Sequence, residues 1–391
     1  MSEWKEYKLG DLTIDGKGSY GIAAPAVEYD ANKYTYLRIT DINDDGTINK
    51  NGLKSVDDKN ASNYLLKPND IVFARTGASV GRSYFYDVRD GELVYAGFLI
   101  KYSLDSTKVN PKLLKFYTHS QVYYDWIQTV DNGATRGNIN AQTYASMPVL
   151  LPDRNKQDEI VSILSSLDDK IDLLNRENET LEAMARTLFR QWFIEEAKEN
   201  WEEKPLSSFG KIVCGKTPPK NESKYFGGSM PFIKIPDMHS SIFVFNSEDS
   251  LTEEGKMYQS EKTLPPGSII VSCIATVGLV VLNAKESQTN QQINSIIPYK
   301  EEYRYFLFLH LKNMYNELNA MASGGTATLN LNTKNFSNIH ITCPNRELLV
   351  EFNEQMQSLF RKIFCNEKQI IVLAKQRNEL LPKLMSNEIA I

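Results

Sequence analysis

Two groups of residues in this chain have types and spacings that suit phosphate or nucleic-acid chemistry. The first is GKIVCGKT at 210–217, which fits the GxxxxGK[ST] pattern that holds nucleotide phosphates. That mechanism needs a helix directly after the lysine, because free amides of its first turn face the phosphates. Pro218 and Pro219 follow at once, and Pro219 opposes a helix that begins at Lys216. No hydrophobic run ending in aspartate follows either, so we interpret the match as coincidental.

Other signatures of catalysis or metal binding are missing from the sequence. There is no N/D-P-P-Y/F/W methyltransferase tetrapeptide, and no acidic nuclease cluster or nucleophile constellation stands out. The four cysteines and four histidines are dispersed without a CxxC pair. This dispersion favours a reducing cytoplasm and argues against structural zinc. We therefore expect no catalytic residue, no metal ligand and no cofactor bound by the chain.

The second group consists of polar loops that occur at equivalent places in the two halves of the chain. In the first half these are 75–82 and 132–138, and in the second half 273–278 and 324–328, with a basic stretch at 216–224. Arginine can bind guanine edges or phosphates, asparagine can pair with adenine, and threonine or serine can serve either use. The alternative is that they are ordinary solvated turns. The candidate DNA-binding residues are Arg75, Thr76, Ser79, Arg82, Arg136, Asn138, Lys216, Thr217, Lys220, Thr276, Thr326 and Thr328.

These loops occur at matching points because the sequence repeats itself. The clearest aligned pairs are YLRITDI with FIKIPDM, LLKPNDIVFARTGASVGR with TLPPGSIIVSCIATVGL, and GATRGNIN with GGTATLNLN. Each copy ends in a long helical heptad pattern. A repeated unit of globular domain plus long helix predicts a pseudo-two-fold molecule, which suits a pseudo-two-fold partner such as duplex DNA. The second copy lacks the arginines of the first, as expected for two readers of different half-sites.

The elements that must position these loops are predicted to be a mixture of strands and helices. In the first domain YTYLRI, DIVFA, RSYFYDV and LVYAGFLIKYSL are typical of strands. In the second domain the expected strands are MPFIKI, GSIIVSCI, GLVVLN and INSIIPY. The patterns predict one helix over 110–128, with Pro111 at its first position, and another over 301–321. The strands are too irregular for a simple βαβ series.

Two long helices give the clearest local pattern. Each follows a Pro-Asx step, at Pro152-Asp153 and at Pro344-Asn345, and Asx residues are strong N-caps. Apolar residues then alternate in steps of four and three, which predicts a coiled-coil seam. The first helix contributes Ile160, Leu164, Leu167, Ile171, Leu174, Asn178, Leu181, Ala185, Leu188 and Trp192 to this seam. The second helix contributes Phe352, Met356, Leu359, Ile363, Asn366, Ile370, Leu373, Arg377, Leu380 and Leu384.

Three residues interrupt this regular pattern. Asn178 and Asn366 place polar groups in the seam, where such residues can fix the register at some cost in stability. The alternative is that they lie in a frayed or solvated stretch. Pro382 cannot continue a helix cleanly, so we expect the second helix to kink or end near Leu380.

Together these patterns predict an α+β chain in which two pseudo-two-fold-related mixed α/β domains are separated by an antiparallel coiled coil. The predicted segments are a domain at 1–151, a helix at 152–199, a domain at 200–344 and a helix at 345–391. A seam of about 32 residues would be about 48 Å long at the helical rise. That length equals about 14 base pairs of duplex DNA.

The charge distribution also separates the helices from the globular parts. The net charge is −5. Residues 152–199 hold 12 acidic and 7 basic side chains, so the acidity lies on the first helix. DNA binding would then need locally clustered basic faces, and further phosphate contacts would come from partners. No apolar run is long enough to span a membrane and the N-terminus is no signal peptide, so we expect a cytoplasmic protein without membrane contact.

Several segments resemble type I restriction–modification specificity (S) subunits. GKTPPKNESKYFGGSMPFIKIPDM is similar to the GGTPS…YWGG.IPW…D segment of that family, and VGLVVL…NQQINSIIP to its G…NQ.I..I.P pattern. LLPKLMSNEI resembles the usual end of the family's distal helix. The resemblance covers essentially the whole chain. The first domain departs from it, because it lacks the GGTP segment and has AGFLI in place of NQQI. This departure puts the transfer of site residues in doubt, not the family.

The resemblance implies that each domain is a target-recognition domain that reads one half of a bipartite, asymmetric DNA site. The helices would fix the unread spacer and dock two modification (M) subunits, which use S-adenosylmethionine to methylate adenine N6. Restriction (R) subunits would join and use ATP and magnesium to translocate and cleave. The S chain would not be catalytic. Two alternatives remain. One is a coiled-coil scaffold with two protein-binding heads, which would not bind DNA. The other is a P-loop NTPase, which would bind nucleotide without any partner subunit.

Overall fold

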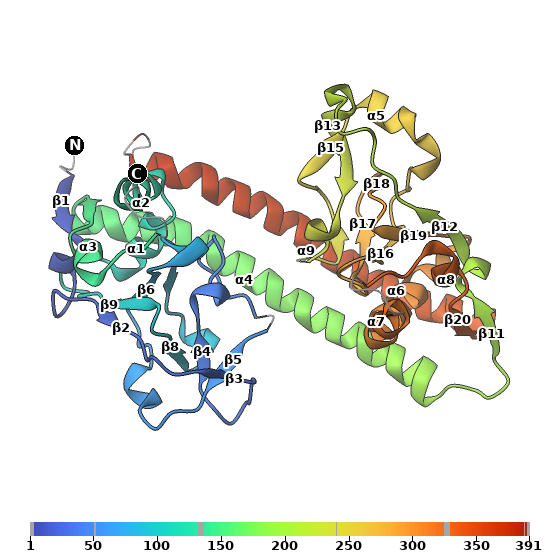
Figure 1. Cartoon of the computed structure of the whole chain (residues 1–391), viewed down its shortest axis with the longest axis horizontal. Helices are drawn as coiled ribbons and strands as arrows, with labels where there is room; N and C mark the ends of the chain where they lie inside the picture. The colour runs from blue at the N-terminus through green and yellow to red at the C-terminus, as the bar shows by residue number, and fades with distance from the viewer. Residues whose placement is uncertain are drawn as a thin grey trace. The chain divides into compact units, whose positions relative to one another are not determined.

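The structure is a computed structural model that describes residues 4–50, 52–131, 137–239, 241–323, 329–386 and 388. The chain divides into two compact units, which are Met1–Asp169 with Ala374–Ile391 (unit 1) and Lys170–Leu373 (unit 2). Each unit contains one globular part and a segment of each of two long helices, α4 (Arg154–Arg190) and α9 (Arg346–Met385) (Figure 1).

Unit 1 is built on two four-stranded sheets. The first has the order β2 (Ser19–Tyr20), β9 (Leu99–Ser103), β6 (Asp70–Ala74), β7 (Ser83–Phe85). The second has the order β3 (Ala26–Val27), β5 (Lys54–Val56), β4 (Thr35–Leu37), β8 (Leu93–Tyr95). The remaining elements are the strand pair β1 (Lys5–Lys8) and β10 (Pro148–Leu151) and the helices α1 (Pro111–Tyr117), α2 (Gln121–Asp131) and α3 (Ala141–Ala145). Phe73 stacks on Tyr144 in a core that also takes in the beginning of α4 and the end of α9.

Unit 2 repeats this plan, with five strands in its larger sheet and three in its smaller sheet. Its larger sheet has the order β12 (Gly210–Cys214), β19 (Ile293–Pro298), β16 (Ile269–Ser272), β17 (Val280–Asn283), β14 (Phe243–Val244). Its smaller sheet has the order β15 (Asp249–Leu251), β13 (Phe226–Ile233), β18 (Gln288–Thr289). The remaining elements are the strand pair β11 (Glu202–Pro205) and β20 (His340–Cys343) and the helices α5 (Glu253–Tyr258), α6 (Arg304–Asn313), α7 (Tyr315–Ala322) and α8 (Thr333–Ser337).

The two topologies share most of their strand order, although β14 has no counterpart in the larger sheet of unit 1. The order β2-β9-β6-β7 recurs as β12-β19-β16-β17, and the parallel pair β4–β8 recurs as β13–β18. The predicted fold class, mixed α and β domains accompanied by two long helices, is therefore confirmed. Both predicted helices within the globular parts, however, are interrupted. In unit 1 the hydroxyls of Thr118 and Ser120 donate to the carbonyls of Lys115 and Tyr117. These bonds compete with a continuous helix and separate α1 from α2. In unit 2 the interruption lies at Met314, between α6 and α7.

Both long helices begin as predicted, but the second one ends later. The Asp153 carboxylate accepts the Lys156 N–H at 3.1 Å, and the Asn345 side chain accepts the Leu348 N–H at 3.0 Å. The expected end near Leu380 was wrong, because α9 continues through Pro382 to Met385, and the alternative of a kink there stays a prediction. Proline removes one backbone hydrogen bond there. Burial of Leu381 and Leu384 in the core of unit 1 offsets that cost.

Burial along the helices follows the predicted seam within each unit. The buried seam residues are Ile160, Leu164 and Leu384 in unit 1, and Leu174, Ala185, Phe352, Met356, Ile363 and Asn366 in unit 2. Half-buried seam residues are Leu167 and Leu380 in unit 1, and Ile171, Leu181, Leu188, Leu359, Ile370 and Leu373 in unit 2. In unit 2 the Asn366 side chain donates to the oxygen of Asn178 at 2.9 Å, and the ring of Phe189 lies 6.3 Å from that of Phe352. The two helices are therefore antiparallel inside this unit.

Candidate nucleic-acid interface

In unit 1 two of the predicted polar loops meet at the end of strand β6. Thr76 forms an antiparallel bridge with Asn138. The Arg75 N–H donates to the Phe98 carbonyl at 3.1 Å, and the Arg75 carbonyl accepts the Ile139 N–H at 2.9 Å. These bonds bring residues far apart in the sequence to one edge of the sheet, as needed for a shared binding surface.

The side chain of Arg75 is held by neutral groups. Its guanidinium carbon lies 4.9 Å from the centre of the Tyr20 ring. Its Nε and Nη2 both donate to the Asn138 Oδ1 at 3.3 Å. The Tyr20 hydroxyl in turn accepts the Ala141 N–H at 3.1 Å. No carboxylate of the described residues pairs with Arg75 or neutralises its positive charge.

Arg82 and Ser79, also candidates from the sequence, are engaged with the protein itself. Arg82 donates through Nε to the Asp44 carboxylate at 2.6 Å and through Nη1 to the Ile42 carbonyl at 3.0 Å. Ser79 is only 8% exposed. Gly81 has a φ of +85° and its carbonyl accepts the Tyr123 hydroxyl, so this part of the loop is shaped by the fold. Arg136 lies outside the described residues.

Unit 2 has the same backbone arrangement at its β16 edge. Ile274 forms an antiparallel bridge with Asn330, and the Cys273 N–H donates to the Gln292 carbonyl at 2.8 Å. The Leu331 N–H donates to the Cys273 carbonyl at 2.8 Å. Thr276 is exposed on the following loop. Thr326 and Thr328 lie outside the described residues.

The basic stretch of unit 2 leaves the end of β12. Lys216 and Lys220 are exposed, and the Lys216 ammonium lies 5.7 Å from the centre of the Tyr258 ring. The Thr217 hydroxyl donates to the Gln291 side-chain oxygen at 2.6 Å. Lys216 thus lies on the surface, while Thr217 is tied to the turn that precedes β19.

The structure also explains the Walker-like match. Gly210–Cys214 forms strand β12, and the next helical turn is the short 3₁₀ segment Ser223–Tyr225. No helix therefore begins at Lys216, as the consecutive prolines predicted. A Cβ atom on Gly215 would lie 2.1 Å from the Asn290 carbonyl oxygen. This glycine thus serves a close contact between two backbone segments, and the match has no phosphate-binding geometry.

Several surface residues at these edges were missed by the sequence analysis. They are Tyr20, Phe98, Gln291, Gln292 and Asn330. Phe98 is 60% exposed and Tyr20 42% exposed, which is unusual for large aromatic side chains. One feature of the sequence could have indicated these positions. The first domain has AGFLI where the second has NQQI, and this difference includes Phe98 and its counterpart Gln292.

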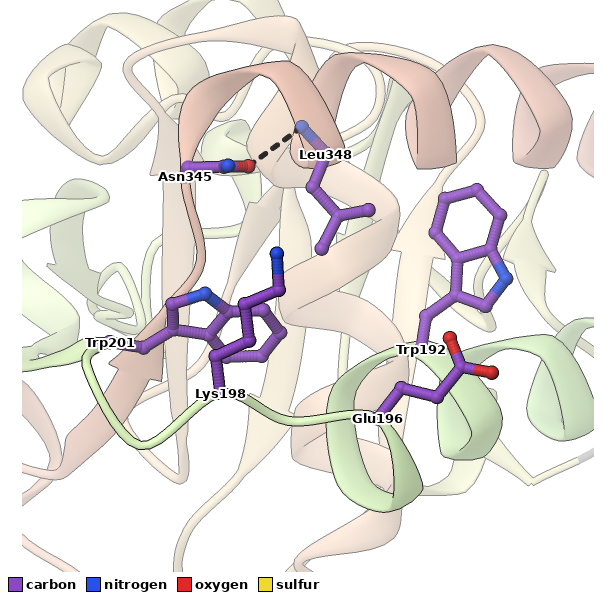
Figure 2. A pocket seen from close by; sticks show the side chains of 6 residues that line it. All are labelled: Trp192, Glu196, Lys198, Trp201, Asn345 and Leu348. Carbon is purple, nitrogen blue, oxygen red and sulfur yellow. Dashed lines mark hydrogen bonds between the residues drawn. The ribbon is translucent and has the colours of Figure 1, made fainter.

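Away from these edges, unit 2 contains a pocket of about 180 Å³ where α4 leads into β11 (Figure 2). Its lining residues are Trp192, Glu196, Lys198, Trp201, Asn345 and Leu348. Figure 2 shows side chains from the helical turn after α4, from the loop that follows it and from the start of α9 around the pocket. None of the candidate DNA-binding residues that the structure describes lines this pocket. Among the described residues no cluster of histidine, cysteine, aspartate and glutamate could hold a metal ion.

In unit 1 a buried ion-pair cluster joins the helices to the globular part. Asp168 accepts from Lys115 at 2.5 Å and from Arg377 at 2.9 Å. Burial raises the pKa of Asp168, but the two cations outweigh burial and hold that pKa below its usual value. The described helices include none that is long and apolar enough to cross a membrane.

Comparison with known proteins identifies similar chains. The family model described as "Type I restriction modification DNA specificity domain" matches residues 1–183 and again 198–375. The type I restriction enzyme HindI specificity subunit of Haemophilus influenzae is 33% identical, and the alignment covers 100% of both chains. The MjaIX specificity subunit of Methanocaldococcus jannaschii is 26% identical over 68% of this chain and 66% of the relative.

A solved structure shows the same fold. The crystal structure of the type I restriction–modification S subunit from M. genitalium superposes with a TM-score of 0.58, at 15% sequence identity. The alignment covers 98% of this chain and 96% of that one.

Proposed function

This chain belongs to the type I restriction–modification DNA specificity family, and we propose that it is the sequence-reading subunit of such a complex. Each globular part reads one half of a bipartite, asymmetric DNA site. One observation carries this proposal: the same hydrogen-bonded backbone frame in both units presents different side chains. The frame that holds Arg75 and Phe98 in unit 1 holds Cys273 and Gln292 in unit 2. A common frame with unequal side chains is what two different half-sites require.

The reading surface consists of the solvent-accessible polar groups at these sheet edges. In unit 1 these are the half-buried Arg75 and Thr76 and the exposed Asn138, and in unit 2 they are the exposed Lys216, Lys220 and Thr276. Arg82, Ser79 and Thr217 support the loops, because their polar atoms are bonded to the protein or buried. Arg136, Thr326 and Thr328 remain candidates for the same surface.

The long helices are proposed to set the unread spacer and to dock two methyltransferase subunits, with restriction subunits joining the complex. Four apolar side chains on the unit 2 segments of these helices are 40–51% exposed, namely Leu173, Met184, Ile371 and Val372. Exposed apolar groups on a helix surface suit coverage by a partner protein. In this arrangement S-adenosylmethionine and ATP with magnesium are bound by the partners, and the chain is not catalytic by itself.

The test is a map of methylated adenines in cells that express the chain together with its methyltransferase subunit. Single-molecule sequencing is expected to show one bipartite motif with a fixed spacer, and no such motif when the chain is omitted. Methylation without sequence preference, or the same motif without the chain, would contradict the proposal. The scaffold alternative predicts that the assembled complex has no affinity for DNA.

A further inference from the structure

We propose that Arg75 reads a guanine in the DNA bound by unit 1, and that Tyr20 and Asn138 position its guanidinium for this contact. The inference rests on the proposed function, because it takes the β6 edge of unit 1 as a DNA-reading surface. We name Tyr20, Arg75, Phe98 and Asn138 the Arg75 cluster.

Arg75 retains hydrogen-bond donors that no acceptor among the described residues uses. A guanidinium carries five N–H donors. The Asn138 oxygen uses Nε and one hydrogen of Nη2. Among the described residues no acceptor bonds to Nη1 or to the second hydrogen of Nη2. Arg82, on the same loop, is instead bound to the Asp44 carboxylate. Arg75 therefore offers a free donor pair and a full positive charge, which is the combination that guanine O6 and N7 accept.

The side chain of Arg75 is held rigidly by its neighbours. The guanidinium stacks on the Tyr20 ring, and Tyr20 lies opposite Ile100 in the β2–β9 pair. Asn138 is fixed by its bridge to Thr76. A planar fork held from two sides loses little conformational entropy on binding and favours a bidentate contact of defined geometry.

The exposed ring of Phe98 beside Arg75 favours a contact with a base over a contact with a phosphate. Phe98 is bonded through its carbonyl to the Arg75 N–H, and its ring is 60% exposed. An exposed ring gains nothing beside a phosphate, but apolar side chains contact thymine methyl groups or base faces in the grooves. A cation fork and an apolar ring at one sheet edge therefore match a base pair and its neighbour better than the backbone.

Unit 2 provides an internal comparison. The Gly21 N–H donates to the Leu99 carbonyl, and its counterpart Gly215 N–H donates to the Ile293 carbonyl. By this correspondence, the counterparts of Tyr20, Arg75, Phe98 and Asn138 in the repeat are Cys214, Cys273, Gln292 and Asn330, respectively. Unit 2 thus has no cation at the position of Arg75. The loss of guanine reading should affect one half-site only.

The experiment maps methylation by the complex of the full chain with its methyltransferase subunit, for the wild type and for Arg75→Ala and Arg75→Lys. We expect both variants to lose preference for guanine at a single position of one half-site by about tenfold or more, because a bidentate contact contributes roughly 1–3 kcal/mol of discrimination. The other half-site and the spacer should not change. Uniformly weaker methylation of an unchanged motif would mean a phosphate contact and would overturn the proposal, as would an unaltered pattern.

Two pairs of variants test the positioning roles. Tyr20→Phe keeps the ring under the guanidinium and should keep the guanine preference, whereas Tyr20→Leu should relax it at the same position as Arg75→Ala. Asn138→Asp places a carboxylate beside Arg75 and should also relax that position, while Asn138→Gln retains a neutral acceptor and should relax it less. If Tyr20→Leu and Asn138→Asp leave the motif unchanged, these residues do not position Arg75.

The matched control is Arg89→Ala, which removes an arginine of unit 1 that is paired with Asp87. Its motif should equal that of the wild type. If the wild-type complex methylates no bipartite motif, the proposed function fails and this inference falls with it. If the wild type has such a motif but the Arg75 variants share it, only the inference fails.

Discussion

Glu367 is a half-buried carboxylate in an environment unlike that of a surface glutamate. It lies in α9 inside unit 2, where its two oxygens accept the N–H groups of Ile242 at 2.7 Å and Phe243 at 3.0 Å. Burial raises the pKa of Glu367 to about 7, although both backbone hydrogen bonds act in the opposite direction. In the unfolded chain the pKa of this group is 4.5, so the folded state holds a proton that the unfolded state releases over this range.

This difference predicts how stability depends on pH. Because the folded state binds more protons between pH 4.5 and 7, the contribution of Glu367 to the free energy of unfolding falls as the pH rises through that window. The total change is on the order of 3 kcal/mol. Glu367→Gln removes the titration and should flatten the curve. Urea unfolding at pH 5 and pH 8 measures the effect, with exposed Glu354→Gln on the same helix as the control. Equal pH dependence in wild type and Glu367→Gln would contradict the assignment.

The seam asparagines permit a second prediction. Asn366 is 2% exposed and donates to Asn178 and to the Glu177 carboxylate. Asn366→Leu leaves polar partners unsatisfied and should lower the free energy of unfolding by about 1–3 kcal/mol. Replacing Asn178 by leucine as well should recover part of this loss. Chemical denaturation of both single variants and the double variant gives the coupling, and strict additivity would show that the two side chains do not interact.

Residue types alone predicted part of the candidate site. Arg75 and Asn138 were identified because they lie in polar loops at equivalent places in the two halves of the chain, and because arginine and asparagine can bind base edges. Tyr20 and Phe98 were not, because a single aromatic residue in a strand pattern usually belongs to a core. Only the pairing of β2 with β9 and the hydrogen bond from Arg75 to Phe98 bring these rings to the surface beside the arginine.

At the scale of elements, the long helices were the most predictable part of the fold. A seven-residue repeat leaves one face that can be buried, so the seam could be written from spacing alone. Interruptions were not predictable, because they depend on tertiary partners. Thr118 is held by the Ser83 hydroxyl, which lies far away in the sequence. The continuation of α9 through Pro382 depends on the burial of the leucines on either side.

The proposed role of the helices can be tested by changing their length. Insertion of one heptad after Leu174 in α4 and one after Ile370 in α9 preserves the seam and the Asn178–Asn366 pairing. Each insertion adds about 10 Å of helix, so the unread spacer should lengthen by about 3 base pairs while both half-sites stay the same. A methylome with the original spacer would refute the role of the helices in setting it, and a circular dichroism spectrum of the variant would verify that the helices form.

At the scale of the whole molecule, the repeat combines a shared frame with different surfaces. The net charge of −5 argues against a generally basic surface, so the proposed DNA reading relies on local groups such as the Arg75 cluster and the lysines that follow β12. Phosphate contacts made by the partner subunits would supply the remaining affinity. We therefore propose that each globular part independently determines one half of the recognised sequence.

The most direct measurement is the methylome of a hybrid chain. Residues 1–151 are replaced by the aligned segment of the Haemophilus influenzae relative, and the hybrid is expressed with the original methyltransferase subunit. We expect one half-site to change, while the other half-site and the spacer length stay those of the parent chain. A hybrid that changes both half-sites, or neither, would contradict the independent reading of two half-sites by two units.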